Sequence, residues 1–148
     1  MNQLLYNYDI YPKVFPVGKP VDITIRGLGE HALFSGGYKV AVLRLDAGLD
    51  AEYDVTAGAD NTLRITYTAP AECEYFLRVF RAGEDRKLFQ LSVYALDPDL
   101  ACRIPLRGDL HMHTCRSDGR EDPATVCANY RKIGYDFLVI TDHHRYYP

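Results

Sequence analysis

Long hydrophobic runs, tryptophan and a targeting signal are all missing from this sequence. It contains no tryptophan and only 2 methionines. The longest unbroken apolar stretch near an expected strand, residues 137–140, is far shorter than the roughly 20 residues that a helix needs to cross a bilayer. The residues after Met1 have neither the charged start nor the long apolar body of a signal peptide. We therefore expect no membrane association and a cytoplasmic location.

A strong charge of either sign is also missing. The formal net charge is −3, and the basic residues are scattered along the chain. This distribution leaves no electrostatic footprint for nucleic acid or for an acidic membrane surface. With 148 residues, of which 47% are hydrophobic, the chain can bury one good core and begin a second.

Paired cysteine motifs are absent as well. The 4 cysteines form no C-x-x-C pair and are Cys73, Cys102, Cys115 and Cys127. Without a secretory signal no disulfide framework is expected, and most of them should be buried reduced thiols. Cys115 lies two residues after His113 and could reach the same metal, but a small residue in a tight loop is the favoured interpretation, since a site with carboxylate ligands seldom recruits a thiolate.

Residues 1–101 consist of short alternating segments separated by glycine- and proline-rich turns. Val21-Asp22-Ile23-Thr24-Ile25 is one example of the period of two that is typical of strands. The segments expected to form strands are 4–10, 21–25, 38–45, 63–67, 74–81 and 87–95. No helical period competes with them. The pattern predicts an immunoglobulin-like β-sandwich of about seven strands as an N-terminal domain.

The pattern changes near residues 97–99, and residues 102–148 are expected to form a second domain of strand, loop, helix and strand. The strands are predicted at 104–113 and 137–140. Between them, Asp122 is a suitable N-cap and Pro123 a suitable first helical residue. An apolar stripe and a stop residue complete the helix signal: Val126, Tyr130, Ile133 and Gly134. The order predicts a β-α-β unit with parallel strands.

Histidine and aspartate gather where both of these strands end. The period of two places His111 and His113 on one side of the first strand, at its carboxyl end. The second strand is followed by residues 141–144, which read Thr-Asp-His-His, and Asp118 lies in the intervening loop. Mixed imidazole and carboxylate ligands suit zinc, manganese or iron. A lone H-x-H pair could instead hydrogen-bond to loop backbone, but two clusters at successive strand ends favour a metal site.

These motifs resemble those of a known family. Residues 109–114 (Asp-Leu-His-Met-His-Thr), 117–119 (Ser-Asp-Gly), Pro123 and 140–143 (Ile-Thr-Asp-His) are similar, in order and spacing, to the first two motifs of the PHP (polymerase and histidinol phosphatase) family. The resemblance covers only about the last forty-five residues of the chain. It implies that this part is the N-terminal portion of a distorted β/α barrel that holds two or three divalent metal ions, such as manganese, zinc or iron.

The resemblance also implies roles for individual residues. His111 and His113 would bind one metal, with Asp118 and His143 as further ligands. Asp142 would not bind the metal itself but would orient its neighbours at the catalytic centre. The family ordinarily has aspartate or asparagine where this chain has His144, so substrate contact and simple solvation remain equally open for that residue.

The implied activity is hydrolysis of a phosphate ester by a metal-bound hydroxide, with small-molecule or nucleotide phosphates as substrates. The later ligands of the family, a glutamate, further histidines and an Asp-x-His motif, would lie beyond Pro148. We therefore expect a truncated piece of a longer enzyme that is inactive alone, or an open sheet edge that packs on the sandwich or on a second copy. The alternative is a non-catalytic binding or assembly module with an incomplete metal site.

Overall fold

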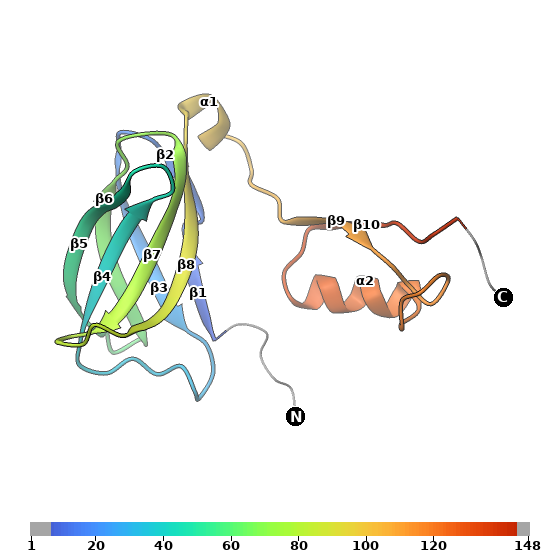
Figure 1. The fold of residues 1–148 in the computed structure, drawn as a ribbon, viewed down its shortest axis with the longest axis horizontal. Helices are drawn as coiled ribbons and strands as arrows, with labels where there is room; N and C mark the ends of the chain where they lie inside the picture. Colours follow the sequence, from blue (N-terminus) through green and yellow to red (C-terminus); the bar gives the residue numbers. More distant parts are fainter. Residues whose placement is uncertain (1–6, 145–148) are drawn as a thin grey trace. The chain divides into compact units, whose positions relative to one another are not determined.

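The computed structural model describes residues 7–144 (Figure 1). The chain divides into two compact units, with the boundary between Arg103 and Ile104. The sequence predicts the boundary slightly earlier, after residue 101. No helix within residues 7–144 is long and apolar enough to cross a membrane.

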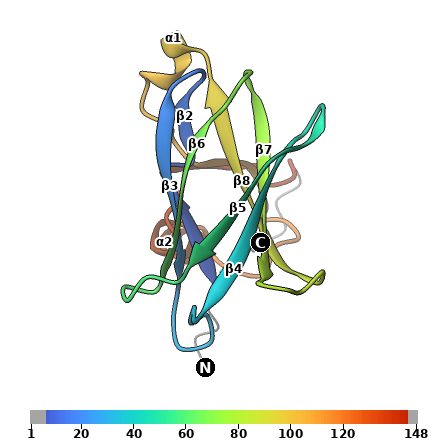
Figure 2. The same ribbon diagram turned by 90° about the vertical axis from the view of Figure 1, so that its left-hand side faces the viewer.

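Eight strands form the first unit. They are β1 (Tyr8–Tyr11), β2 (Val14–Pro16), β3 (Pro20–Gly27), β4 (Gly37–Arg44), β5 (Gly48–Thr56), β6 (Thr62–Thr68), β7 (Cys73–Arg81) and β8 (Lys87–Leu96). One sheet has the order β1-β3-β6 and the other the order β2-β8-β7-β4-β5. The two sheets face each other as a β-sandwich (Figures 1 and 2). Residues 4–6 of the expected first strand lie outside the described residues.

The core of the sandwich follows from the alternation in its strands. Ile23 and Ile25 of β3 point inward from one sheet, and Leu77 and Val79 of β7 point inward from the other, each with at most 1% of its surface exposed. Their neighbours in the sequence lie on the outer faces, as the period of two requires. One hydrophobic cluster includes residues from both sheets. The prediction of a β-sandwich is confirmed.

The strand order has the immunoglobulin-like arrangement. The chain crosses between the sheets from β1 to β2, from β2 to β3, from β3 to β4, from β5 to β6 and from β6 to β7. Near the start of β7 the hydroxyl of Tyr75 donates a hydrogen bond of 2.8 Å to the carbonyl of Ala71 and accepts one of 3.3 Å from its N–H. A tyrosine that bonds back to the chain just before it is the corner found in such sandwiches.

The sequence pattern does not predict two of these strands, β2 and β5. β5 is an edge strand that pairs only with β4, and its exposed residues weaken the apolar alternation. β2 is only three residues long, ends in Pro16 and pairs in parallel with β8 at the other edge of the sheet. Edge strands need only one paired side, which accommodates proline and polar residues. The expectation of about seven strands is therefore one too low.

A short helix, α1 (Pro98–Ala101), follows β8 and completes this unit.

The cysteines of both units, within residues 7–144, are free thiols. The expectation that most are buried is wrong, because Cys102, Cys115 and Cys127 are exposed and Cys73 is half-buried. Three of them lie in short helices or loops outside the sandwich core.

The second unit is a β-α-β unit. The strands β9 (Gly108–Met112) and β10 (Phe137–Ile140) pair in parallel, and α2 (Pro123–Lys132) connects them and lies along one face of the pair (Figure 1). The helix prediction is confirmed: Asp122 accepts hydrogen bonds from the first N–H groups, and Gly134 has a φ of 85° just past the end. The barrel to which such a unit could belong stays a prediction.

The first strand of this unit is shorter than the sequence predicts. Residues 104–107 are not strand, because β9 can form ladder hydrogen bonds only along the four residues of β10. Phe137 and Val139 remain 44% and 43% exposed. α2 therefore covers one face of β10 only, although residues 137–140 are all apolar.

Candidate metal centre

Both strands of the second unit end at the same edge of the sheet. Because β9 and β10 are parallel, the residues that follow them, His113 and residues 141–144, come to one place. A backbone hydrogen bond of 2.8 Å from Thr141 to the carbonyl of Met112 joins the two ends. This edge is where α/β folds present polar side chains to ligands.

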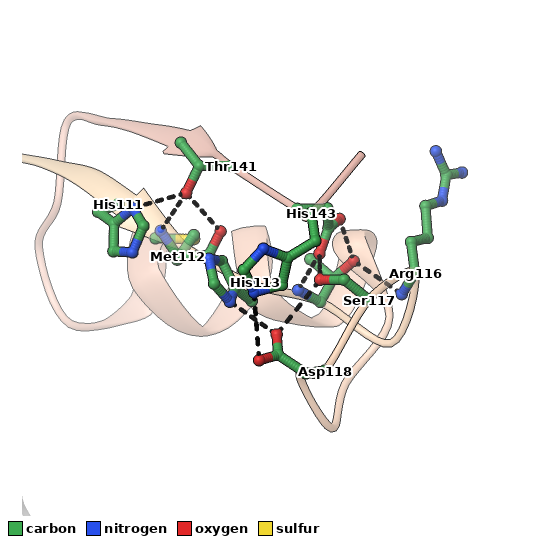
Figure 3. Close-up of polar contacts among 10 residues, drawn as sticks. His111, Met112, His113, Arg116, Ser117, Asp118, Thr141 and His143 are labelled. Carbon is green, nitrogen blue, oxygen red and sulfur yellow. Dashed lines mark hydrogen bonds and ion pairs between the residues drawn. The ribbon is translucent and has the colours of Figure 1, made fainter. Parts of the chain in front are cut away.

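Three of the expected ligands meet there: His113, Asp118 and His143 (Figure 3). Each can offer one ligand atom such that all three atoms lie within 4.8 Å of one another. Nδ1 of His113 lies 2.7 Å from one carboxylate oxygen of Asp118, and Nε2 of His143 lies 3.4 Å from the other. The carboxylate therefore stands between the two imidazoles.

These distances fit a divalent cation in a specific way. Two atoms that bind one zinc ion at about 2.1 Å in a tetrahedron lie about 3.4 Å apart. The separation of 3.4 Å between His143 and Asp118 matches that value. The separation of 2.7 Å between Nδ1 of His113 and Asp118 is instead that of a hydrogen bond, which orients the imidazole of His113. The donor set suits zinc, manganese or iron.

The electrostatics of Asp118 favour a cation. The hydrogen bond from His113 is the main cause that lowers the pKa of this carboxyl below its usual value, and the charges of His113 and His143 act in the same direction. Asp118 is exposed, with 64% of its side chain accessible. At neutral pH it offers a negative charge at the surface, where an ion can reach it.

His111 is held apart from this group. Its Nδ1 lies 3.0 Å from the hydroxyl of Thr141, and its ring centroid lies 4.9 Å from that of His113. The register between the strands shifts here, because from Asp109 to Met112 β9 advances three residues while its partner β10 advances two. The rings of His111 and His113 still contact each other edge to face, so what distinguishes His111 is its hydrogen bond to Thr141. The structure thus brings three of the four predicted ligands into one group, without His111.

The carboxylate of Asp142 is engaged in hydrogen bonds and does not belong to the cluster of candidate ligands. It accepts hydrogen bonds of 2.6 Å from the backbone N–H and 2.6 Å from the hydroxyl of Thr114, and one of 2.7 Å from the hydroxyl of Ser117. The bond from Ser117, followed by those from Thr114, lowers the pKa of Asp142 to about 2. This geometry suits the orienting role that the resemblance implies for Asp142.

Two other candidates lie outside the group. His144 is exposed and, within residues 7–144, has no hydrogen bond or ion pair. Cys115 is exposed, and its backbone N–H is bonded to the carbonyl of Glu121 at 2.8 Å. Its thiol is not among the clustered ligand atoms. For Cys115 the structure therefore favours the loop role over the ligand role.

An open pocket of about 440 Å³ adjoins the cluster. Its lining residues come from the loop after β9, the start of α2 and the end of β10: Arg116, Pro123, Ile140, Asp142 and His143. Arg116 is one of the lining residues, and His143 belongs to both the pocket and the cluster (Figure 3). A small molecule could therefore reach the candidate ligands from this side.

Comparison with known proteins finds limited likeness. No family model and no curated protein matches the chain. Among solved structures it is similar to the filamin domain of Lin-41, with 13% identity, a TM-score of 0.44, and coverage of 61% of this chain and 92% of that one. It is also similar to the CARDB domain of the PF1109 protein from Pyrococcus furiosus, determined in complex with di-metal ions, with 19% identity, a TM-score of 0.34, and coverage of 61% and 86%. Such values carry no argument about function.

Sequence reasoning missed the residues that support the ligands. Thr114, Ser117 and Thr141 each make a hydrogen bond that holds part of the site, and Arg116 lines the pocket. The three residues with hydroxyl groups stand inside the motifs at 109–114, 117–119 and 140–143, which is the signal that could have drawn attention to them. Their partners lie 25 to 30 residues away in the chain, and only the fold identifies them.

Proposed function

We propose that this chain belongs to a metal-dependent hydrolase that acts on phosphate esters. The observation that carries the proposal is the cluster of His113, Asp118 and His143 at the carboxyl ends of two parallel strands. Two imidazoles and one carboxylate form the kind of donor set that hydrolytic metal sites use, because three protein ligands leave a coordination position open. The resemblance of these same residues to the motifs of the PHP family supports the assignment.

In this proposal the residues at the site have different roles. A divalent cation held there would activate water at neutral pH and neutralise charge on phosphoryl oxygens. Asp118 supplies negative charge to hold the cation and keeps the ring of His113 oriented through their hydrogen bond. Arg116 lines the adjoining pocket and would attract the phosphate group of the substrate.

The test measures metal binding on the whole chain. Calorimetry with Mn²⁺ and with Zn²⁺ should show binding to the 148-residue protein that His113→Ala abolishes. His31→Ala is the matched control, because His31 is an exposed histidine in the sandwich. Hydrolysis of a phosphomonoester is not required of this chain, which is expected to be inactive alone, so metal binding decides the test. Metal binding that survives His113→Ala would refute the assignment.

A binding or assembly module is the second candidate, and a separate observation favours it. Large apolar side chains of the second unit are exposed: Ile104 by 83%, Leu106 by 63% and Leu110 by 68%. Exposed apolar groups in one region commonly mark an interaction surface. Sedimentation at increasing concentration distinguishes the candidates, because association that Leu110→Glu disrupts, in a protein without metal binding or turnover, favours the module.

A further inference from the structure

Thr114 occupies an unusual position next to the candidate ligands. It directly follows His113, is 0% exposed, and with Thr62 makes up the buried polar residues within residues 7–144. A buried hydroxyl is stable only when its hydrogen bonds are made. The hydroxyl of Thr114 donates to Asp142 at 2.6 Å and accepts from the N–H of Arg116 at 3.3 Å.

The backbone of Thr114 closes the loop that carries Asp118. Its carbonyl accepts hydrogen bonds from the N–H groups of Ser117 at 3.0 Å and Gly119 at 2.9 Å. The loop is so tight that a Cβ on Gly119 would lie 2.4 Å from the carbonyl oxygen of His113. The return of the chain places the carboxylate of Asp118 2.7 Å from Nδ1 of His113.

The same residue ties this loop to the other strand. The carboxylate of Asp142 receives both the N–H and the hydroxyl of Thr114, together with the hydroxyl of Ser117. Asp142 immediately precedes His143 in the chain. The separation of 3.4 Å between His143 and Asp118 therefore depends on a connection of two segments 28 residues apart.

We propose that Thr114 is a positioning residue for the candidate metal centre, which holds His113 and Asp118 in register with His143 through its paired hydrogen bonds to Asp142. This inference rests on the proposed function, because it assigns a role toward the metal. Thr114 touches neither the ion nor a substrate. It acts by making the ligand geometry present before the ion arrives, and loss of such supporting hydrogen bonds typically weakens metal affinity by about 10- to 100-fold.

The principal experiment compares Thr114→Val with Thr114→Ser in the full chain, with Mn²⁺ as the calorimetric probe. Thr114→Val should weaken binding by roughly 10- to 100-fold, and Thr114→Ser, which keeps the hydroxyl, should bind like the parent. Thr62→Val is the matched control, because Thr62 is also buried and donates a 2.6 Å hydrogen bond to Asp60 in the sandwich. Equal affinity of Thr114→Val and the parent overturns the inference, as does equal weakening by Thr62→Val.

A double-mutant cycle separates positioning from general destabilisation. If Thr114 acts through Asp142, the double variant Thr114→Val with Asp142→Asn should bind Mn²⁺ no more weakly than the worse single variant. The reason is that both substitutions disrupt the same interaction, the one between Thr114 and Asp142. Additive losses overturn the inference. Should Thr114→Val fail to fold, Ser117→Ala replaces it, since Ser117 bonds the same carboxylate; it should weaken binding several-fold, and unchanged binding overturns the inference.

A metal-free measurement keeps this inference distinct from the proposed function. Nitrogen NMR of the metal-free protein should show His113 with its proton on Nδ1, facing Asp118, in the parent and in Thr114→Ser. Thr114→Val should lose that preference. If the parent binds no metal, the proposed function fails while this result still decides whether Thr114 sets the orientation of His113; an unchanged His113 signal in Thr114→Val overturns the positioning role.

Discussion

The hydroxyl of Thr141 lies 3.0 Å from Nδ1 of His111 and 3.1 Å from both the N–H and the carbonyl of Met112. A hydroxyl has one proton to donate and two lone pairs to accept with. The N–H of Met112 can only donate and its carbonyl can only accept. All three contacts are hydrogen bonds only if the hydroxyl proton goes to the carbonyl and the second lone pair accepts a proton from Nδ1 of His111.

This accounting predicts the tautomer of His111. With its proton on Nδ1, His111 exposes the lone pair of Nε2 to a ligand, whereas a free imidazole in water prefers the opposite tautomer. Nitrogen NMR should detect the Nδ1–H form in the parent and in Thr141→Ser. Thr141→Val should shift the ring toward the Nε2–H form. An Nε2–H parent would contradict the assignment.

The low pKa of Asp142 predicts a response to acid. Its folded-state pKa of about 2 lies below the usual value of 3.8, because the hydroxyl of Ser117 and the two groups of Thr114 bond to the ionised form. A lowered pKa stabilises the folded state above the unfolded pKa, and this contribution is lost as the pH falls through the folded pKa. The carboxyl carbon signal of Asp142 should therefore titrate near pH 2.

The control for that titration is Ser117→Ala. Removal of the largest single cause should raise the midpoint of Asp142 toward its usual value while leaving the two bonds from Thr114. An Asp142 midpoint near 3.8 in the parent would mean that the three hydrogen bonds are not formed in solution.

Arg116 should govern the affinity of the pocket for phosphate. With inorganic phosphate as the calorimetric probe and Mn²⁺ present, Arg116→Ala should weaken binding by roughly tenfold or more, because a charge-assisted hydrogen bond to phosphate is lost. Arg120→Ala is the matched control, since Arg120 is exposed in the same loop but does not line the pocket. Equal changes in phosphate affinity for both variants would indicate a general electrostatic effect.

The corner formed by Tyr75 should matter for the stability of the sandwich. Its side chain is 0% exposed, and Tyr75→Phe would leave the N–H and the carbonyl of Ala71 without their hydrogen-bond partner. We expect a loss of about 1–3 kcal/mol in the free energy of unfolding, measured by denaturant titration. Tyr94→Phe is the comparison, because the hydroxyl of Tyr94 bonds Glu74 on the exposed surface. A loss no larger than that of Tyr94→Phe would contradict the role of the corner.

Much of the fold follows from local patterns that the sequence displays. Apolar alternation in segments such as Val21–Ile25 is enough to predict strands, and Asp122, Pro123 and Gly134 mark the helix ends because capping is a local interaction. The edge strands β2 and β5 could not be predicted in this way. Their pairing depends on one neighbour each, and their polar or proline residues hide the alternation.

The candidate site shows the same division. The chain order alone indicates that His113, Asp118 and His143 belong near two strand ends, because parallel strands end at one edge. It also suggests that His111 joins them, since a regular strand would place it beside His113. In the structure the two imidazoles lie in contact, but Nδ1 of His111 is engaged by the hydroxyl of Thr141, and this contact forms only because β9 pairs with β10.

The sequence by itself determined the kinds of element, their order and the chemistry available at the strand ends, because alternation, capping and residue type act over a few neighbouring positions. Only the tertiary structure decided which of those groups meet. The bond between Thr114 and Asp142 and the contact between His111 and Thr141 join residues 28 and 30 positions apart. Such contacts exist only once the strands have paired. They therefore decide which residues cluster as candidate ligands and which, like Asp142, support that cluster.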